Sequence, residues 1–425
     1  MILGVIADDF TGATDVASML VRAGMHTVQV LGVPEGGLPQ ADAVVIALKT
    51  RTIAPADAVA QSLAALQALR AAGARQIYFK YCSTFDSTPQ GNIGPVTDAL
   101  MAALDTDFTI ACPAFPENGR TVFKGHLFVG DVLLSDSGMR NHPLTPMTDA
   151  NLVRVLQAQT AQKVGLLRHD VLDDGAPAAH DRVKQLRAEG VKIAVADAVS
   201  NAHLLTLAEA CADLPLLTAG SGLALGLPPA YARRGWFTPN SNAADLDTLQ
   251  GPAAVVSGSC SEATNAQVAQ WLAAGRAALQ IDPLALHEGR QTADGVLAQA
   301  MKALPQGQVL VYATAAPESV RTVQQALGVQ AAGELVEHAL ARIAKGLVQG
   351  GVRRLLVAGG ETSGAVVQAL GVQQLRIGAA ICPGVPWTQA TLPGSGEAVQ
   401  LALKSGNFGG VDFFAQALQQ AGVAL

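Results

Sequence analysis

The chain lacks the features of a secreted, membrane-spanning or disulfide-bonded protein. Its five cysteines are an odd number scattered over 425 residues, and none forms a CxxC pair. This pattern argues against a disulfide framework or a zinc site. The apolar N-terminal run ends at Asp8 without the basic start of a signal peptide. No stretch approaches the roughly 20 apolar residues that a membrane span requires. We therefore expect a soluble, cytoplasmic protein.

Charge and several catalytic motifs are also scarce. Charged residues make up only 15% of the chain, and the formal net charge is −6, so the basic face that nucleic acid requires is not expected. The eight histidines show no HxxxH or HExxH spacing, and no metal site made of protein ligands alone is predicted. GxSxG is absent, which gives no support to serine hydrolase chemistry. Half of the residues are hydrophobic, as in a packed globular enzyme.

Short apolar runs alternate with Ala/Leu/Gln-rich stretches of helical length. Runs that are apolar on both faces and separated by helices indicate parallel sheets covered by helices. We predict strands at 2–7, 27–31, 43–48, 77–81, 109–111, 164–167, 193–196 and 216–218. The helices between them are predicted at 56–71, 95–104, 178–189 and 202–212.

A polar stretch at 233–251 interrupts this pattern and is interpreted as an inter-domain linker. A second α/β pattern follows, with strands at 253–257, 309–313 and 354–358 and helices from Glu262, over 333–349 and from Ser363. The expected fold is two α/β domains, 1–235 and 250–425, with mainly parallel sheets and a substrate cleft between them.

The first candidate site follows the first strand, where Asp8 and Asp9 precede Thr11 and Gly12. A helix that starts at this turn offers free N–H groups to an anion. One carboxylate could act as a general base on a hydroxyl, and the other could bind a metal-bridged phosphate. The alternative is that Asp9 or Thr11 only caps the helix.

Two further stretches offer groups that bind a sugar acid. Lys80 begins a hydroxyl-rich loop that ends in glycine, and Arg51 could fork onto a carboxylate. A turn-rich stretch after the fifth strand leads into an expected β-hairpin at 121–129. The candidate substrate-binding residues are Arg51, Lys80, Ser83, Asp86, Gly91, Asn92, Phe115, Arg120 and His126. An ordinary polar loop, a surface arginine and a structural histidine are the alternatives.

Three Gly/Ser-rich loops occur after the predicted linker. Two of them follow apolar strands and open helices, where backbone N–H groups can cradle phosphates. None is a Walker A loop or a GxGxxG fingerprint. Together they predict a nucleotide site made by Ser257, Gly258, Ser259, Gly359, Gly360, Glu361, Thr362, Ser363, Gly406 and Asn407.

Four motifs in this order resemble the four-carbon acid sugar kinase family over essentially the whole chain. They are the Asp8–Asp15 segment, Pro113–Arg120, Gly359–Gly364 and Lys404–Gly409. The resemblance implies an N-terminal acid-sugar-binding domain, a C-terminal ATP-binding domain and transfer of a phosphoryl group from MgATP. It places Asp8 and Asp9 at the acceptor hydroxyl and implies a small-molecule partner, with a homo-oligomer possible.

One departure narrows the resemblance. Threonate and erythronate kinases of the family usually carry Lys-x-Asp-Ser-Thr-Leu-Arg-Gly in the second motif, whereas this chain has Cys82 in place of the Asp and no Arg before Gly91. This version is similar to the 3-oxo-tetronate (3-dehydrotetronate) 4-kinase subgroup. A threonate or erythronate 4-kinase, an ADP-forming acid–CoA ligase and a non-catalytic sugar-acid sensor remain as alternatives.

Overall fold

The computed structural model describes residues 1–34, 36–142 and 144–423 and separates into two compact units, Met1–Ala244 and Asp245–Leu425. The division falls inside the predicted linker, where no helix or strand lies between Arg233 and Ala253. No helix in the described parts of the chain is both long and apolar enough to cross a membrane.

Unit 1 is built on a parallel sheet with the strand order β2-β3-β1-β4-β11-β5-β10-β9. The strands are β1 (Leu3–Ala7), β2 (Thr27–Leu31), β3 (Ala43–Ala47), β4 (Gln76–Lys80), β5 (Thr109–Cys112), β9 (Val164–Leu167), β10 (Ile193–Ala196) and β11 (Leu216–Ala219). Every residue of β1, β3 and β4 is buried, which explains why their sequences are apolar on both faces.

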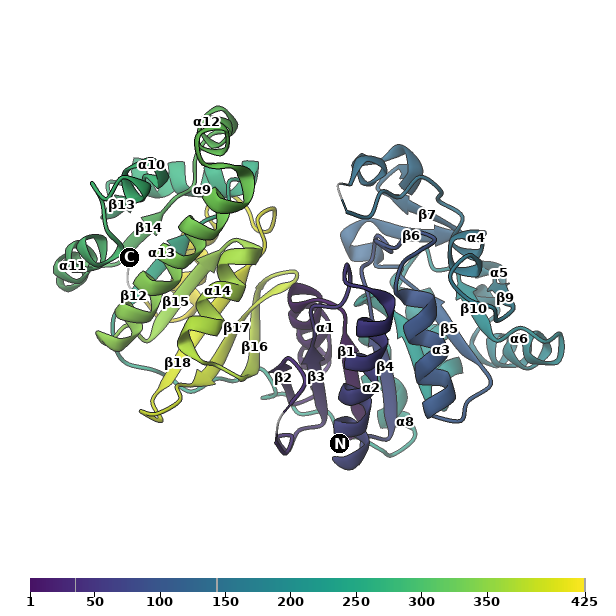
Figure 1. Cartoon of the computed structure of the whole chain (residues 1–425). Helices are drawn as coiled ribbons and strands as arrows, with labels where there is room; N and C mark the ends of the chain where they lie inside the picture. Colours follow the sequence, from purple (N-terminus) through teal and green to yellow (C-terminus); the bar gives the residue numbers. More distant parts are fainter. Residues whose placement is uncertain (35, 143, 424–425) are drawn as a thin grey trace. The chain divides into compact units, whose positions relative to one another are not determined.

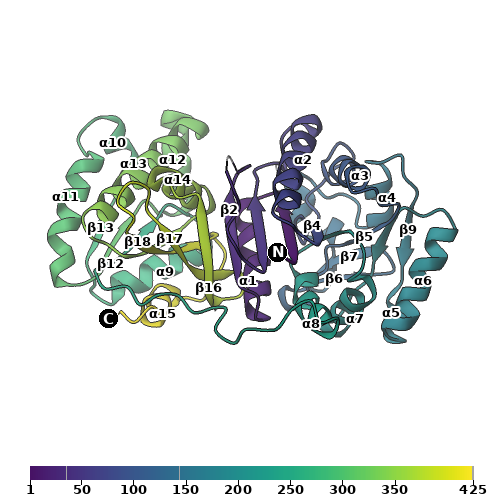
Figure 2. The same cartoon turned by 90° about the horizontal axis from the view of Figure 1, so that it is seen from below.

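Helices cover both faces of this sheet, with α2 and α3 on one side and α1, α7 and α8 on the other (Figures 1 and 2). The helices are α1 (Phe10–Arg22), α2 (Pro55–Ala71), α3 (Ile93–Ala103), α4 (Leu152–Gln157), α5 (His169–Asp173), α6 (Ala176–Ala188), α7 (Asn201–Cys211) and α8 (Leu227–Arg233). The predicted hairpin is present as β6 (Arg120–Phe123) and β7 (His126–Val129), which pair with β8 (Val132–Leu133) in a small antiparallel sheet.

Unit 2 contains a mixed sheet with the order β13-β14-β12-β15-β18-β17-β16. Its strands are β12 (Ala253–Ser257), β13 (Ala278–Gln280), β14 (Val309–Tyr312), β15 (Arg354–Ala358), β16 (Gln374–Cys382), β17 (Val385–Thr391) and β18 (Ala398–Lys404). The strands β13, β14, β12, β15 and β18 run parallel, whereas β16, β17 and β18 pair antiparallel. The apolar runs of the sequence predict β12, β14 and β15 but not this antiparallel edge.

In unit 2, α13 and α14 cover one face of the sheet, and α9 and α15 cover the other (Figure 2). The helices are α9 (Glu262–Ala273), α10 (Pro283–His287), α11 (Ala293–Ala303), α12 (Pro317–Leu327), α13 (Val329–Gln349), α14 (Gly360–Leu370) and α15 (Phe413–Gln420). A core on the α9 and α15 side contains Trp271, Trp387, Phe413 and Phe414. Both units are therefore α/β domains with mainly parallel sheets, as predicted. The cleft between them stays a prediction.

Candidate active site and nucleotide cavity

The carboxyl ends of three strands in unit 1 bring the predicted charged residues together. β1 lies between β3 and β4, and Ala7 is in register with Ala47 and Lys80. The Asp8 N–H donates to the Lys80 carbonyl at 3.0 Å, and the Asp8 carbonyl accepts from the N–H of Thr50 at 2.9 Å. The parallel register therefore gathers the residues that follow each strand at one edge of the sheet.

Arg51 is the centre of this cluster. Its Nε and Nη2 donate to the two Asp8 oxygens at 3.0 and 2.8 Å, and Nη2 also donates to Asp9 Oδ1 at 2.6 Å. Its Nη1 lies 3.6 Å from Asp86 Oδ2. Although burial disfavours its charge, Asp8 and Asp9 raise the Arg51 pKa well above its usual value. Arg51 therefore stays charged and holds three carboxylates at the end of the sheet.

The two adjacent carboxylates differ in accessibility. The Asp8 side chain is 7% exposed, and burial raises its pKa despite the opposing effect of Arg51. Asp9 is 29% exposed and is the N-cap of α1, where its Oδ1 accepts from the N–H of Gly12 at 3.0 Å. Asp9 therefore caps α1. Its Oδ2 takes part in neither of these bonds, so the cap leaves one oxygen for chemistry.

The loop after β4 has an unusual backbone. Phe85 and Asp86 have φ values of 67° and 43°, a left-handed region that non-glycine residues rarely adopt. Thr84 stabilises this turn, because its hydroxyl donates to Asp86 Oδ1 at 2.6 Å. Burial raises the pKa of the Cys82 thiol to about 11, so it stays neutral beside Arg51. Ser83 is partly exposed in the same turn.

Asn92 holds the backbone of the segment that carries Arg51. The Asn92 amide donates to the carbonyls of Thr50, Arg51 and Ile53 at 2.6, 3.2 and 3.0 Å. Gly91 packs so closely on Ser87 that a Cβ would overlap the hydroxyl. Asn92 thus fixes the segment that carries Arg51. The absence of a side chain at Gly91 allows the backbone there to pack against Ser87.

The remaining candidates of unit 1 lie around β6 and β7. Phe115 is buried and pairs through its backbone with Arg120, whose guanidinium donates to the Asn118 carbonyl. His126 begins β7, where Nδ1 lies 2.9 Å from the Lys124 carbonyl and Nε2 lies 3.3 Å from Asn151 Nδ2. Neither contact links His126 to the Arg51 cluster, and a substrate-binding role for His126 stays a prediction.

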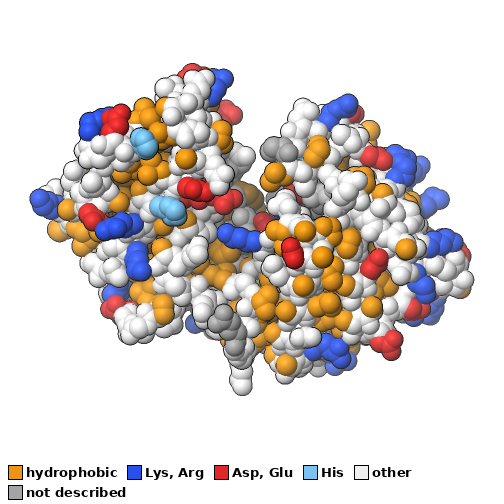
Figure 3. All heavy atoms as spheres, viewed as in Figure 1, with side chains coloured by type: hydrophobic (Ala, Val, Ile, Leu, Met, Phe, Trp, Pro, Cys, Tyr) orange, Lys and Arg blue, Asp and Glu red, His pale blue; other side chains and the backbone are white. Residues whose placement is uncertain are grey.

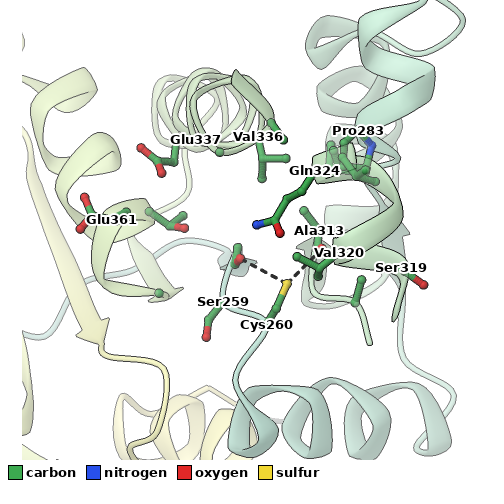
Figure 4. Close-up of a pocket in the computed structure, with 18 of the residues that line it drawn as sticks. Ser259, Cys260, Pro283, Ala313, Ser319, Val320, Gln324, Val336, Glu337 and Glu361 are labelled. Carbon is green, nitrogen blue, oxygen red and sulfur yellow. Dashed lines mark hydrogen bonds between the residues drawn. The ribbon is translucent and has the colours of Figure 1, made fainter. Parts of the chain in front are cut away.

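Unit 2 contains a cavity of about 750 Å³, in the size range of ligand pockets. Six of the predicted nucleotide-binding residues line it: Gly258, Ser259, Gly359, Gly360, Glu361 and Thr362. Figure 4 shows Ser259 and Cys260 at one side of this cavity, with Glu337 and Glu361 facing it from α13 and α14.

The turn before α14 is suited to bind an anion. Gly359 has a φ of 129°, and it is the N-cap of α14 without a side-chain hydrogen bond to the first turn. Gly258 packs directly against Thr362, where a Cβ would overlap Oγ1. Two backbone turns therefore approach each other closely, and the first N–H groups of α14 lie beside the cavity.

The other four predicted nucleotide-binding residues do not line the cavity. Ser257 is fully buried and shares a 2.6 Å hydrogen bond with Thr314, and Ser363 is buried within α14. Asn407 is exposed. Gly406 packs against Ser259, which lines the cavity, and a Cβ on Gly406 would lie 2.8 Å from Ser259 Oγ. Its carbonyl accepts from Ser261, Thr264 and Lys404 at 2.6, 2.9 and 2.7 Å.

The apolar wall of the cavity was not predicted from the sequence. It comes from α10, α12 and α13 and includes Pro283, Val320, Val323, Val329 and Val336 (Figure 4). The sequence feature that could have indicated this wall is α12, which is strongly amphipathic although none of its residues is buried. An apolar helix face without a core partner indicates a ligand surface.

The described residues do not form a metal centre of their own. The described residues contain no group of three or more His, Cys, Asp or Glu side chains that could hold an ion. A magnesium ion bound mainly by phosphate oxygens and water needs no such group. Glu361, in the first turn of α14, is the carboxylate nearest in sequence to the glycine turn.

Comparison with family models gives two adjacent matches. Residues 3–227 match a model described as a sugar-binding N-terminal domain. Residues 254–414 match one described as a nucleotide-binding C-terminal domain. The Arg51 cluster falls in the first match, and the cavity falls in the second.

Curated relatives are similar over nearly their whole length. A 3-oxo-tetronate kinase of Cupriavidus necator is 62% identical over 99% of this chain and 97% of its own. A Burkholderia multivorans protein of the same name is 62% identical over 98% and 97%. One from Pseudomonas fluorescens is 61% identical over 99% and 97%.

Two solved structures are similar in fold and sequence. A Salmonella typhimurium LT2 protein, named as a proposed tRNA synthase, has a TM-score of 0.90 and 45% identity, covering 98% of this chain and 99% of its own. A Haemophilus influenzae protein of a domain-of-unknown-function family has a TM-score of 0.85 and 46% identity, covering 98% and 100%. In Figure 3 the basic side chains are scattered among acidic ones, and no broad basic surface of the kind RNA requires is visible on that face.

Proposed function

This chain belongs to the four-carbon acid sugar kinase family, and we propose that it transfers a phosphoryl group from MgATP to the 4-hydroxyl of a 3-oxo-tetronate. The products are the 3-oxo-tetronate 4-phosphate and ADP. The observation that carries the proposal is the 61–62% identity, over nearly full length, to relatives named 3-oxo-tetronate kinase. The residues of the two units support the same chemistry.

The nucleotide is assigned to the cavity of unit 2. Its apolar wall suits the base, because α12 and α13 present valine side chains there. The uncapped first turn of α14 suits the phosphates. Magnesium, when bound, neutralises charge on the phosphate oxygens, and Glu361 is assigned to hold it. These groups orient the nucleotide and shield its phosphates from water.

The acceptor is assigned to the Arg51 cluster of unit 1. Asp9 is the more accessible of the two adjacent carboxylates, and its Oδ2 is not used by the cap or by Arg51. We assign it to orient the 4-hydroxyl and accept its proton. Both oxygens of Asp8 accept hydrogen bonds from Arg51, one from Nε and one from Nη2, so Asp8 holds the guanidinium in place. Phosphoryl transfer depends mainly on such positioning and charge neutralisation.

The proposal is tested by measuring ADP release from the purified protein with MgATP and a panel of four-carbon acids. The panel contains D- and L-erythronate, D- and L-threonate and their 3-oxo forms, with and without CoA. We expect CoA-independent turnover confined to the 3-oxo acids. Turnover of threonate or erythronate instead would overturn the substrate. ATP binding without turnover of any acid would overturn the acceptor class, and absence of ATP binding would favour a sensor.

A further inference from the structure

Among the described residues of unit 1, eight buried side-chain polar atoms have no hydrogen-bond partner. Three of them, Asp15 Oδ1, Ser221 Oγ and Arg120 Nε, belong to residues that act on one another. Burying such an atom without a partner is costly, so native proteins rarely do so unless a ligand or water completes its hydrogen bonds.

These atoms belong to one cluster. Burial raises the pKa of the Asp15 carboxyl, and the charges of Lys80 and Arg120 oppose this shift. The Ser221 hydroxyl opposes it as well, through a contact with the carboxyl that does not have the geometry of a full hydrogen bond. Lys80 and Ser221 are brought together by the sheet, because Lys80 is in register with Ala219 at the end of β11. Asp15 reaches the same place from the second turn of α1, and Asp9 is also within electrostatic range.

The backbone that carries Ser221 is fixed on several sides. The Tyr78 hydroxyl donates to the Gly220 carbonyl, and the Gly220 N–H donates to the Cys112 carbonyl at 3.0 Å. A Cβ on Gly220 would lie 2.7 Å from the Pro113 carbonyl, and one on Gly222 would overlap the Ala114 carbonyl. Ser221 is only 1% exposed, so its hydroxyl is held in a rigid, nearly dry position.

The charges of the cluster distinguish it from the Arg51 site. Arg51 already pairs with Asp8, Asp9 and Asp86. Lys80 and Arg120 form no ion pair within 4 Å among the described residues; their hydrogen bonds go to the carbonyls of Tyr81 and Asn118. These two cations are therefore better placed than Arg51 to pair with the carboxylate of an acid ligand.

We propose that Asp15 and Ser221 form a subsite for the hydroxyl adjacent to the carboxylate of the acid sugar, with Lys80 and Arg120 binding that carboxylate. This inference rests on the proposed function and adds the binding of the end remote from the transferred phosphoryl group. Asp15 Oδ1 accepts the hydrogen bond of the C2 hydroxyl, since a carboxylate in this position requires a donor. Ser221 completes the contact as donor or acceptor. The 4-hydroxyl is left to Asp9.

The test compares two freshly prepared acids that differ only at C2. They are 3-oxo-tetronate and 4-hydroxy-3-oxobutanoate, which lacks the C2 hydroxyl. Calorimetric titration of the full chain without nucleotide measures both affinities, so turnover is not required. We expect wild type to bind the hydroxylated acid about 10- to 100-fold more tightly, the effect of one hydrogen bond to a charged group. Asp15→Ala is expected to bind both acids equally, and Ser221→Ala is expected to show a reduced preference.

Matched controls separate recognition from folding. Ser62→Ala removes another buried hydroxyl that lacks a partner, on α2 outside this cluster, and should retain the wild-type preference. Asp15→Leu has a side chain of similar size without any hydrogen-bond acceptor and serves if Asp15→Ala does not fold. Unchanged nucleotide affinity in each variant verifies that unit 2 is intact.

The outcomes distinguish this inference from the proposed function. Equal binding of both acids by wild type would mean that only water completes Asp15 and would overturn the subsite. An undiminished preference in Asp15→Ala or Asp15→Leu would overturn it too, as would failure of wild type to bind either acid. An Asp15-dependent preference without phosphoryl transfer would leave the subsite standing and reject the kinase activity.

Discussion

Arg51 shows how a single residue sets the charge balance of the acceptor site. Its side chain is 20% exposed, and it contacts Asp8, Asp9 and Asp86. The sequence predicted that Arg51 could bind a carboxylate, but the partners found are the protein's own. That outcome could not be predicted, because the three carboxylates and Arg51 follow three different strands, and only the sheet order brings them together.

Replacing Arg51 by Met should destabilise the protein in a pH-dependent way. Removing one partner of a buried ion pair typically costs about 3–5 kcal/mol, because the other charge stays buried. Burial already raises the Asp8 pKa, and Arg51 opposes that shift. Without Arg51 the folded-state pKa rises further, so charged Asp8 costs more stability as pH rises above 3.8. Urea unfolding should show a larger deficit at pH 7 than near pH 4, close to the usual pKa of the carboxyl.

The control is Arg22→Met, which removes the exposed pair with Glu117. Arg22 is 52% exposed, and its Nη1 lies 2.8 Å from Glu117. Exposed pairs contribute about 0–1 kcal/mol, so this variant should lose little stability at either pH. A deficit of Arg51→Met that is independent of pH would contradict the role given to the buried carboxylates.

Asp9→Asn tests the acceptor carboxylate directly. The amide oxygen can still cap α1, but the side chain no longer accepts a proton readily, so kcat should fall about 100-fold or more while nucleotide affinity is retained. Steady-state kinetics and calorimetry measure the two quantities. Asp57→Asn, an exposed acid in the first turn of α2, makes the same charge change and should leave both near wild type. Full activity of Asp9→Asn would remove its role.

At the scale of elements, most parallel strands were predictable and the antiparallel edge was not. β1, β3 and β4 are buried throughout, so their sequences are apolar at every position. In β16 buried and exposed residues alternate irregularly, and its register with β17 shifts twice, so no simple period marks it. The apolar face of α12 was missed for another reason: it lines a cavity, and cavity walls resemble core faces in sequence.

The segment from β18 to α15 depends on a buried lysine. Lys404, the last residue of β18, donates to Thr264 Oγ1 and to the carbonyls of Ser405 and Gly406 at 3.1, 3.1 and 2.7 Å. Gly406 in turn packs against Ser259, which lines the cavity. The ammonium group has three protons for three acceptors, so it can satisfy all three only while charged.

The affinity for nucleotide should therefore fall as pH rises past the Lys404 pKa. Burial lowers that pKa to about 8, so the charged form is lost above pH 8. We expect the nucleotide KM to rise between pH 7 and 9.5 in wild type. Lys404→Met should show a KM about 10-fold higher at pH 7, from lost ordering bonds, with no further rise. Lys302→Met, which changes an exposed lysine of α11, should follow the wild-type profile. If the nucleotide KM of wild type and of Lys404→Met changed with pH in the same way, Lys404 would not be the group responsible.

At the scale of the whole molecule, each unit carries one half of the proposed reaction. The Arg51 cluster and the Asp15 subsite lie within Met1–Ala244, and the cavity lies within Asp245–Leu425. The two-domain division was predictable from the polar linker, because a long segment without helical or strand periodicity separates two α/β patterns. Which residues meet in each site could not be predicted, because that depends on the register of the strands in each sheet.

Hydrogen exchange should separate the binding of the two ligands. A non-hydrolysable ATP analogue with magnesium is expected to slow exchange at 257–261, 313–324 and 359–364, because these segments surround the cavity. The 3-oxo acid alone is expected to slow exchange at 8–15, 80–92 and 220–222, which carry the Arg51 cluster and the Asp15 subsite. Helix α6, which carries none of these residues, provides the internal reference, and its exchange should be unchanged by either ligand.

The assignment of the ligands to the two units would be reversed if the acid protected only unit 2 or the nucleotide protected only unit 1. Protection of each site by its own ligand alone would show that neither unit needs the other's ligand to form its binding site, since ordering of backbone amides reports local stability.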